Sequence, residues 1–400
     1  MGNARSVGPR FFPLDEELEL LPGSLTPLGY EQLVRLSGWM PFGKASEVFE
    51  EFTGIVVSSA LSRRYTERAG AVYVELQSAE VVWLEREKPP APSGADKLQV
   101  SVDGAMVPLL HGEWAEARTL VIGEVQPAVE EKGEPVIHTR KLSYFSRKVP
   151  AQEFGQLAVV EIHRRGVENA RAVAAISDGA DWEQSFVDYH CPNAVRILDF
   201  PHASEHINQV GQFLHGEGTP QARQWLEERL HRLKQAGPEE LLAELHELNQ
   251  QHPEAAPVSG NLAYLQKRQA HMQYPQFLAQ GWPIGSGIVE SGNKLVVEAR
   301  LKGSGMHWAD SHVDPMLAIR NILCSDRWKE EWPKIATRLR HPHLPAAVVA
   351  TPFERPAPSL PRSLQPTNPS DPAAKSPKTN PWRRFKYGRS LFQRTDFPKN

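Results

Sequence analysis

The spacing of apolar residues changes along the chain, and this change predicts helices first and a sheet afterwards. Between residues 29 and 70, apolar side chains recur at intervals of three and four residues, which is typical of helices that bury one face. They are Leu33, Leu36, Met40, Val48, Phe49 and Phe52. Gly54 interrupts the pattern, so we expect two helices around a glycine turn, the second ending at Gly70 and followed by a longer helix over 71–88.

The two helices around Gly54 resemble a helix-turn-helix, a motif that binds DNA through its second helix. Arg63, Arg64 and Arg68 lie on that second helix and are candidate DNA-binding residues. The alternative is a helical pair that simply packs, because the first helix carries three glutamates within residues 47–51 that would repel phosphate.

From residue 97 onward, apolar positions alternate with polar ones, which is the pattern of half-buried strands. We expect a meander of three strands in LQVSVDGAMVPLL, TLVIGEVQPAV and TRKLSYFSRKV. Helices and strands then alternate, with a helix over 151–165, a strand over 171–177, a helix over 181–190, a strand over 194–199 and a helix over 202–215. The prediction is a mixed α/β sheet in the element order expected of a ribonuclease H-like core.

The remaining patterns divide the chain into regions. Polar helical sequence interrupts the α/β pattern before GWPIGSGIVESGN and is interpreted as an insertion, and further helices are expected over 286–302 and 309–332. The predicted regions are an irregular N-terminal segment (1–28), a helix-turn-helix-like region (29–88), the first part of the α/β core (97–218), the helical insertion (219–280), the second part of the core (281–335) and a proline-rich basic tail (341–400).

The C-terminal tail differs from the rest in composition. Residues 351–400 hold 10 prolines, ten Lys or Arg and three Asp or Glu, a formal balance of +7. Such a segment is expected to be disordered and weakly attracted to nucleic acid. Arg383 and Arg384 in WRRFKYGR are candidates for phosphate contact. The alternative is a solvated basic tail without a specific site.

Overall composition excludes several classes of protein. The formal net charge is −3, so any affinity for nucleic acid must come from local patches. Two cysteines, Cys191 and Cys324, make no disulfide framework and fit a reducing cytoplasm. No run of 18 apolar residues predicts a membrane span, and the sequence MGNARSVGPRFF lacks the apolar core of a signal peptide. We therefore expect a protein of the cytoplasm.

Three acidic residues carry most of the chemical information. Asp103 and Asp178 each follow an apolar run that we interpret as a strand, and Glu290 begins a helical stretch. Strand ends and a facing helix can bring carboxylates to one point, where they repel unless cations neutralise them. We expect the three to bind divalent metal ions, because a pair of ions about 4 Å apart is the usual device for attack at phosphate. Asp181, otherwise a helix cap, and Glu298 are alternative carboxylates.

Histidines and basic residues accompany these acids. In ILDFPHASEH, Asp199 and His202 lie where a strand gives way to a helix, and His202 could contact a phosphate or orient a carboxylate. The alternative is a helix cap with a structural histidine. A zinc site of His202 and His206 is conceivable, but HExxH and a third ligand are missing. The residues expected to hold a DNA backbone, or merely to pair with glutamates at i, i+4, are Lys294, Arg300 and Lys302.

Four motifs in this order resemble the DDE transposases of bacterial insertion sequences, in particular the ISKra group, which is related to Mutator-like transposases. They are SVDGAMVP, AISDGADW, DFPHASEH and GSGIVESGNKLVVEARLKGSGMHW. The resemblance covers about residues 11–335. It implies a ribonuclease H-like catalytic domain with Asp103, Asp178 and Glu290 as metal-binding acids and Asp199 and His202 as an accessory motif. Trp308 would pack or contact DNA.

The resemblance also implies cofactors and partners. Two Mg²⁺ ions, for which Mn²⁺ can substitute, would support cleavage of transposon ends and their transfer to target DNA, by a homo-oligomer on paired ends close to the bacterial nucleoid. One departure is that related proteins often carry a cysteine-rich zinc segment before FFPLDEEL, whereas SVGPRFFPLDEEL has no cysteine pair. The alternatives are a nuclease with the same core that does not transpose, an inactive transposase-derived DNA-binding protein, and a helical interaction protein with Asp-Gly turns.

Overall fold

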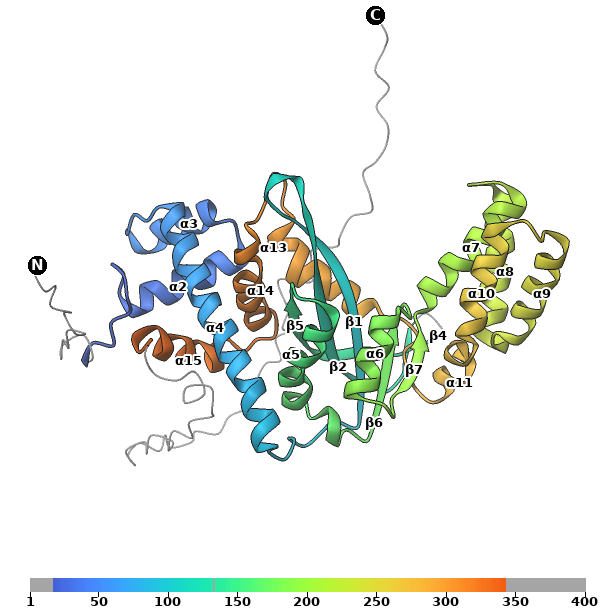
Figure 1. The fold of residues 1–400 in the computed structure, drawn as a ribbon, viewed down its shortest axis with the longest axis horizontal. Coiled ribbons are helices and arrows are strands. Elements are labelled where there is room, and N and C mark those ends of the chain that lie inside the picture. The colour runs from blue at the N-terminus through green and yellow to red at the C-terminus, as the bar shows by residue number, and fades with distance from the viewer. Residues whose placement is uncertain (1–16, 132–133, 343–400) are drawn as a thin grey trace, which may run out of the picture. The chain divides into compact units, whose positions relative to one another are not determined.

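The computed structural model describes residues 17–131 and 134–342, which form a mixed α/β structure around a five-stranded sheet (Figure 1). Most of the expected irregular segment 1–28 and nearly all of the expected tail 341–400 lie outside the described residues, as do Arg383 and Arg384. No helix in the described part of the chain is both long and apolar enough to cross a membrane. Both cysteines are free.

The sheet joins three antiparallel strands to two parallel ones. In the described residues its order is β5-β2-β1-β6-β7. β1–β2 and β2–β5 are antiparallel pairs, whereas β1–β6 and β6–β7 are parallel pairs. The bounds are Lys97–Pro108 (β1), Trp114–Val125 (β2), Thr139–Arg147 (β5), Ala172–Ser177 (β6) and Val195–Leu198 (β7), with a short hairpin of Val129–Glu131 (β3) and Glu134–Val136 (β4). The predicted meander and the predicted alternation of helix and strand are confirmed.

Helices cover both faces of the sheet, and the alternation along β1 assigns side chains to each face. Leu98, Val100 and Val102 pack against α5 and α6. Ala105 and Val107, at odd-numbered positions of the strand, point to the other face and pack against α12 and α14. Asp103 is also at an odd-numbered position, so its side chain lies on the face covered by α12. The covering helices are Ala151–Arg164 (α5), Asp181–His190 (α6), Gly287–Gly292 (α12), Ala299–Leu301 (α13) and Asp310–Cys324 (α14).

The N-terminal helices share a hydrophobic core with the last two helices of the described chain. These five elements are Pro27–Trp39 (α2), Phe42–Thr53 (α3), Ser59–Glu87 (α4), α14 and Trp328–Arg340 (α15). The predicted turn is present, since Gly54 ends α3 with a φ of +70° and Ser58 accepts a hydrogen bond from the Leu61 N–H at the start of α4. The predicted helix end at Gly70 is wrong. A Cβ at Gly70 would collide with the Pro315 carbonyl, so this glycine permits close helix packing rather than a stop.

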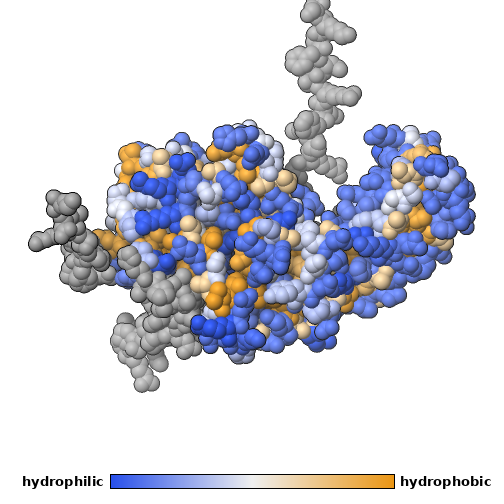
Figure 2. All heavy atoms as spheres, in the orientation of Figure 1, coloured by the Kyte–Doolittle hydropathy of each residue, from blue (hydrophilic) through white to orange (hydrophobic). Residues whose placement is uncertain are grey.

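The predicted insertion is helical and packs on the outer parallel strands. Its helices and α7 form one core with Ile176 of β6 and Ile197 of β7. Figure 2 shows that the visible surface of this segment is mostly hydrophilic. The helices are Phe200–His215 (α7), Pro220–Ala236 (α8), Glu239–Gln251 (α9), Ala256–Lys267 (α10) and Tyr274–Ala279 (α11).

The helix predicted over 286–302 is interrupted. α12 is followed by a π-helical segment, Asn293–Glu298, and then by the short α13. A π-helical turn accommodates an extra residue and frequently occurs at functional sites. At the end of α12, a Cβ on Gly292 would come within 2.7 Å of the Val121 side chain, so this glycine lets α12 lie directly on β2.

Candidate metal centre

Two of the predicted acids reach the same end of two neighbouring strands. The parallel register of β1 and β6 ends at Val100↔Ala175, and Asp103 and Asp178 each lie three residues beyond that pair. They are therefore level with each other on strands about 4.8 Å apart. Asp103 does not end its strand, as the sequence suggested, because β1 continues to Pro108 alongside β2. What ends before Asp103 is the pairing of β1 with β6, which leaves that edge open to side chains.

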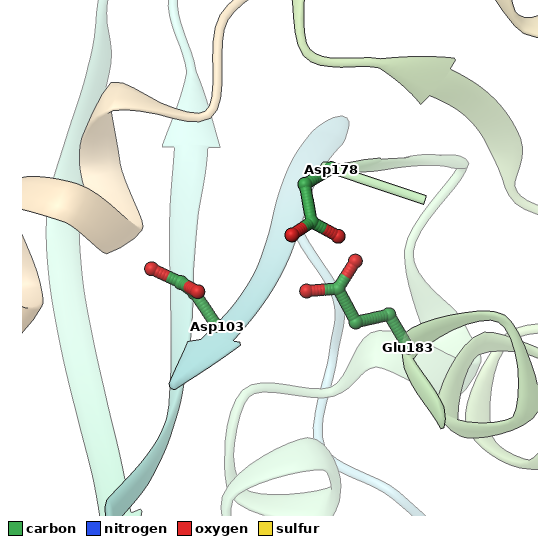
Figure 3. Close-up of side chains that lie close together, drawn as sticks. All are labelled: Asp103, Asp178 and Glu183. Atoms are coloured by element: carbon green, nitrogen blue, oxygen red, sulfur yellow. The ribbon is translucent and has the colours of Figure 1, made fainter. Parts of the chain in front are cut away.

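Asp103, Asp178 and Glu183 form an acidic cluster. Each offers a carboxylate oxygen, and these oxygens lie within 4.8 Å of one another. Figure 3 shows the Asp178 and Glu183 carboxylates facing each other, with the Asp103 carboxylate beside them on the neighbouring strand. Within residues 17–131 and 134–342, no other group of three His, Cys, Asp or Glu residues meets this distance. The structure thus brings two of the three predicted acids together and adds a third that the sequence analysis did not propose.

The turn between β6 and α6 explains the position of Glu183. Gly179 has a φ of +84°, a conformation that glycine adopts without strain. The Glu183 Oε2 atom accepts hydrogen bonds from the N–H groups of Gly179 and Ala180, at 3.1 and 3.3 Å. Asp181 was the expected cap, but Ala180 occupies that position and Glu183 supplies the side chain. The N–H groups just before a helix need an acceptor when they are shielded from water, and the carboxyl group of Glu183 provides it.

The carboxylates of the cluster differ in proton affinity. Burial raises the pKa of Asp103 to about 6, and the charge of Asp178 adds to this effect. Burial also raises the pKa of Glu183 to about 10, together with its hydrogen bond to Asp178. Although burial opposes it, hydrogen bonds from Glu183 and the Ala180 N–H hold the pKa of Asp178 below its usual range. Without metal, Glu183 therefore keeps a proton at neutral pH and donates it to Asp178, as adjacent carboxyl groups do when they cannot both ionise.

The donor atoms fit a divalent cation. The Asn293 Nδ2 atom donates to Asp103 Oδ2 at 2.9 Å, whereas the Asn293 Oδ1 atom is buried and has no hydrogen-bond partner in the described structure. An unpaired buried carbonyl oxygen is unfavourable unless a cation or donor approaches it. Carboxylate and amide oxygens are the ligands that Mg²⁺, Mn²⁺ and Ca²⁺ prefer. The residues present could hold such an ion, and Asn293 is a second site residue that the sequence analysis did not propose.

The carboxylate of Glu290 lies outside the acidic cluster. Its side chain is 67% exposed and pairs with Lys294 at a separation of four residues. Glu290 is nevertheless close in the chain to the site, because Asn293, one helical turn later, contacts Asp103. α12 itself packs on β1 and β2. The structure therefore places the backbone of Glu290 beside the cluster but directs its side chain to solvent.

Asp199 connects two segments that flank the cluster. Its Oδ2 atom accepts from the His202 N–H at 3.1 Å, which caps α7, and its Oδ1 atom accepts from the Ser286 N–H at 2.6 Å, just before α12. These bonds match the helix-cap interpretation. His202 and His206 lie with ring centres 5.0 Å apart, and neither is part of the acidic cluster.

The predicted DNA-binding residues fall into two groups. Arg63, Arg64 and Arg68 are all exposed on α4. Lys294 and Lys302 pair at i, i+4 with Glu290 and Glu298.

Arg300 and Trp308, by contrast, are buried. The Arg300 guanidinium lies 4.6 Å from the Phe42 ring centre and 5.2 Å from that of Trp308, and the Trp308 Nε1 atom donates to the Leu301 carbonyl. These contacts give both side chains partners within the protein, so they contribute to packing.

Comparison with models of known protein families gives no match, and no curated protein matches the chain.

Proposed function

We propose that this chain is a metal-dependent transposase with a ribonuclease H-like core, which cleaves DNA at the ends of an insertion sequence and joins them to a target. It would act as a homo-oligomer on paired DNA ends. The observation that carries the proposal is the meeting of Asp103 and Asp178 on adjacent parallel strands, with the helix of Glu290 packed beside them.

The sheet supports this proposal through its order. A three-stranded antiparallel meander followed by two parallel strands is the arrangement that the motif resemblance implies. Counted along the sequence, Asp103 lies in the first strand of this sheet, β1, and Asp178 follows the fourth, β6. Ligands in α/β sheets gather beyond the carboxyl ends of parallel strands. Asp178 follows β6 directly, and Asp103 lies where β1 outruns β6.

Glu290 can join the acids at small cost. Its only described ion pair is an exposed one with Lys294, and exposed pairs of this kind contribute little to stability because solvent screens them. The Glu290 side chain is 67% exposed, so rotation about its side-chain bonds would disturb little packing. A divalent ion beside Asp103 would attract the Glu290 carboxylate far more strongly than one solvated ammonium group does.

In the proposed reaction, the chain's residues hold the ions and the strands. Asp103 and Asp178 would bind the metal from the sheet, Glu290 would close the site from α12, and Asn293 would hold Asp103 in place. Two bound Mg²⁺ ions would supply an activated water or 3′-hydroxyl and stabilise the departing 3′ oxygen. The arginines of α4, Arg63, Arg64 and Arg68, would contact phosphates.

The proposal is tested with the full chain, Mg²⁺ and DNA that carries the sequences flanking its reading frame. We expect cleavage and joining of a 3′-hydroxyl end to plasmid, both abolished in Asp103→Asn while DNA binding persists. Asp188→Asn, an exposed acid on α6, is the matched control and should retain activity. Cleavage without joining would favour the non-transposing nuclease, and binding without cleavage the inactive derivative. Full activity in Asp103→Asn would remove Asp103 from the site.

A further inference from the structure

Two residues of the helical insertion contact the turn that carries Asp178. The Tyr264 hydroxyl donates a hydrogen bond to the carbonyl oxygen of Asp178, and the Arg268 Nη2 atom donates to the carbonyl oxygen of Gly179. Both come from the end of α10, 86 or more residues away in sequence. Because they bind consecutive carbonyls, they fix two successive peptide planes of this turn.

The two side chains are themselves held in place. The Arg268 guanidinium lies 3.7 Å from the Tyr264 ring centre, and the His206 ring stacks on Tyr264 with centres also 3.7 Å apart and planes 13° from parallel. Two planar groups at that distance must occupy opposite faces of the ring. The His206 Nδ1 atom is in turn 2.6 Å from the Oδ1 atom of the buried Asn261. This stack leaves Tyr264 little freedom to rotate away from Asp178.

Gly179 completes the contact. A Cβ at this position would collide with the Arg268 side chain, so the turn and the guanidinium lie against each other without space between them. The Asp178 carboxylate accepts a hydrogen bond from the Ala180 N–H within the same turn, at 2.8 Å. Movement of the carbonyls of Asp178 and Gly179 would therefore move the carboxylate as well.

We propose that Tyr264 and Arg268 are positioning residues for Asp178, through which the helical insertion sets the geometry of the metal-binding site. This inference rests on the proposed function, because it takes Asp178 as a metal ligand. It gives the insertion a role in the chemistry beyond adding surface. Residues that orient metal ligands typically contribute 10- to 100-fold to metal affinity, so loss of either contact should weaken metal binding by about tenfold or more.

The test uses two conservative variants of the full chain. Tyr264→Phe retains the ring and its stack on His206 and loses only the hydroxyl, and Arg268→Lys retains the charge but loses the planar group that reaches Gly179. The dissociation constant for Mn²⁺ is measured from the electron paramagnetic resonance signal of the free ion, so that no catalysis is needed. Circular dichroism in EDTA checks that each variant is folded.

The matched control is Arg229→Lys. Arg229 lies in the same insertion, stacks 4.5 Å from the ring centre of Trp225 and pairs with Glu244, but touches no residue of the site. We expect both test variants to bind Mn²⁺ about tenfold more weakly, with the control unchanged. We also expect the Mg²⁺ concentration for half-maximal cleavage to rise, with most of the maximal rate recovered at saturating Mg²⁺.

The outcomes separate the two proposals. Wild-type Mn²⁺ affinity in folded Tyr264→Phe and Arg268→Lys would overturn the positioning role, whether or not the chain cuts DNA. Weaker Mn²⁺ binding in these variants, in a chain that cleaves no DNA, would support the positioning role and overturn the transposase. Unchanged Mn²⁺ affinity with weaker DNA binding would mean that Arg268 contacts the nucleic acid instead, and would also overturn the positioning role.

Discussion

Two groups of acidic residues in this molecule differ in whether cationic side chains pair with them. Beside α4 and α5, glutamates are matched by cations: Arg327 binds both oxygens of Glu161, at 2.5 and 2.8 Å, and Arg164 binds both Glu80 and Glu331. Beyond the last paired residues of β1 and β6, no ion pair among the described residues involves Asp103, Asp178 or Glu183. We call the first group the arginine-paired cluster.

The difference shows in the pKa values. Burial opposes ionisation of Glu161, but Arg327 outweighs it and holds the pKa of Glu161 below its usual range. In the acidic cluster, burial raises the pKa values of Asp103 and Glu183, and for Glu183 its hydrogen bond to Asp178 adds to the effect, whereas hydrogen bonds lower the pKa of Asp178. The acidic cluster has no arginine or lysine paired directly with its carboxylates, although the charges of His202 and Arg268 help to lower the pKa of Asp178, so this cluster could hold an external cation. This contrast is stronger support for a metal site than the presence of acids alone.

The largest expected effect comes from breaking the arginine-paired cluster. Arg327→Met leaves the carboxylate of Glu161, which is 3% exposed, without its partner. Removing one partner of a buried pair costs about 3–5 kcal/mol, so we expect the free energy of unfolding in urea to fall by that amount. Asp103→Asn should instead maintain or increase the stability of the metal-free chain. Equal destabilisation by the two substitutions would contradict the contrast between the clusters.

A comparison of Glu183→Gln with Glu290→Gln identifies the third metal ligand. An amide in place of the Glu183 carboxyl group can still donate to Asp178 and accept from the Gly179 N–H, so we expect cleavage within about tenfold of wild type. Loss of the Glu290 carboxylate should reduce the cleavage rate by about 10²- to 10³-fold, since a ligand contributes several kcal/mol to stabilisation of charge by the metal. Single-turnover cleavage in Mg²⁺ measures both. The reverse ranking would make Glu183 the ligand and Glu290 an exposed pairing residue.

The smallest expected effect is a difference in pH dependence. The raised pKa of Asp103 means that the folded chain holds this proton more tightly than the unfolded chain, so its contribution to stability falls as the pH rises from about 4 to 6. The lowered pKa of Glu161 acts with the opposite sign, and its contribution is lost as the pH falls below the ordinary glutamate range. Denaturant unfolding in EDTA at several pH values, with Asp103→Asn and Glu161→Gln as references, measures each slope. If the contributions of Asp103 and Glu161 to stability changed in the same direction with pH, the opposite pKa shifts assigned to them would be wrong.

Local patterns predict much of this fold and part of the site. Alternation in LQVSVDGAMV gives β1 and assigns Asp103 to the face opposite Val102, and the apolar run before Asp178 gives β6. Residues that meet through tertiary packing leave a weaker signal. Glu183 occupies the third position of a helix, where a glutamate usually caps the backbone, and no local pattern shows that it also faces Asp103. Tyr264 lies in a polar helical stretch that gives no indication of its contact with Asp178.

Two glycines also show that a local pattern does not reveal tertiary packing. Gly54 and Gly70 are both potential helix ends by sequence, and only Gly54 ends one, because its φ is positive. At Gly70 the backbone stays helical and the missing side chain makes room for Pro315. Arg300 and Trp308 are similar cases, since a basic and an aromatic residue after the third acid suggest a nucleic-acid surface, but tertiary packing buries both.

The close contact at Gly70 has a mechanical consequence. Because the backbones of α4 and α14 touch there and α14 packs on β5, closely packed helices connect Arg63 and Arg68 to the sheet. In the proposed function, the DNA segment bound by those arginines would lie at a fixed distance, measured along the duplex axis, from the bond that the acids cleave. The number of base pairs between the gripped segment and the cut would then be set by the protein, and a half-turn added to that spacing would rotate the target bond to the wrong side of the duplex.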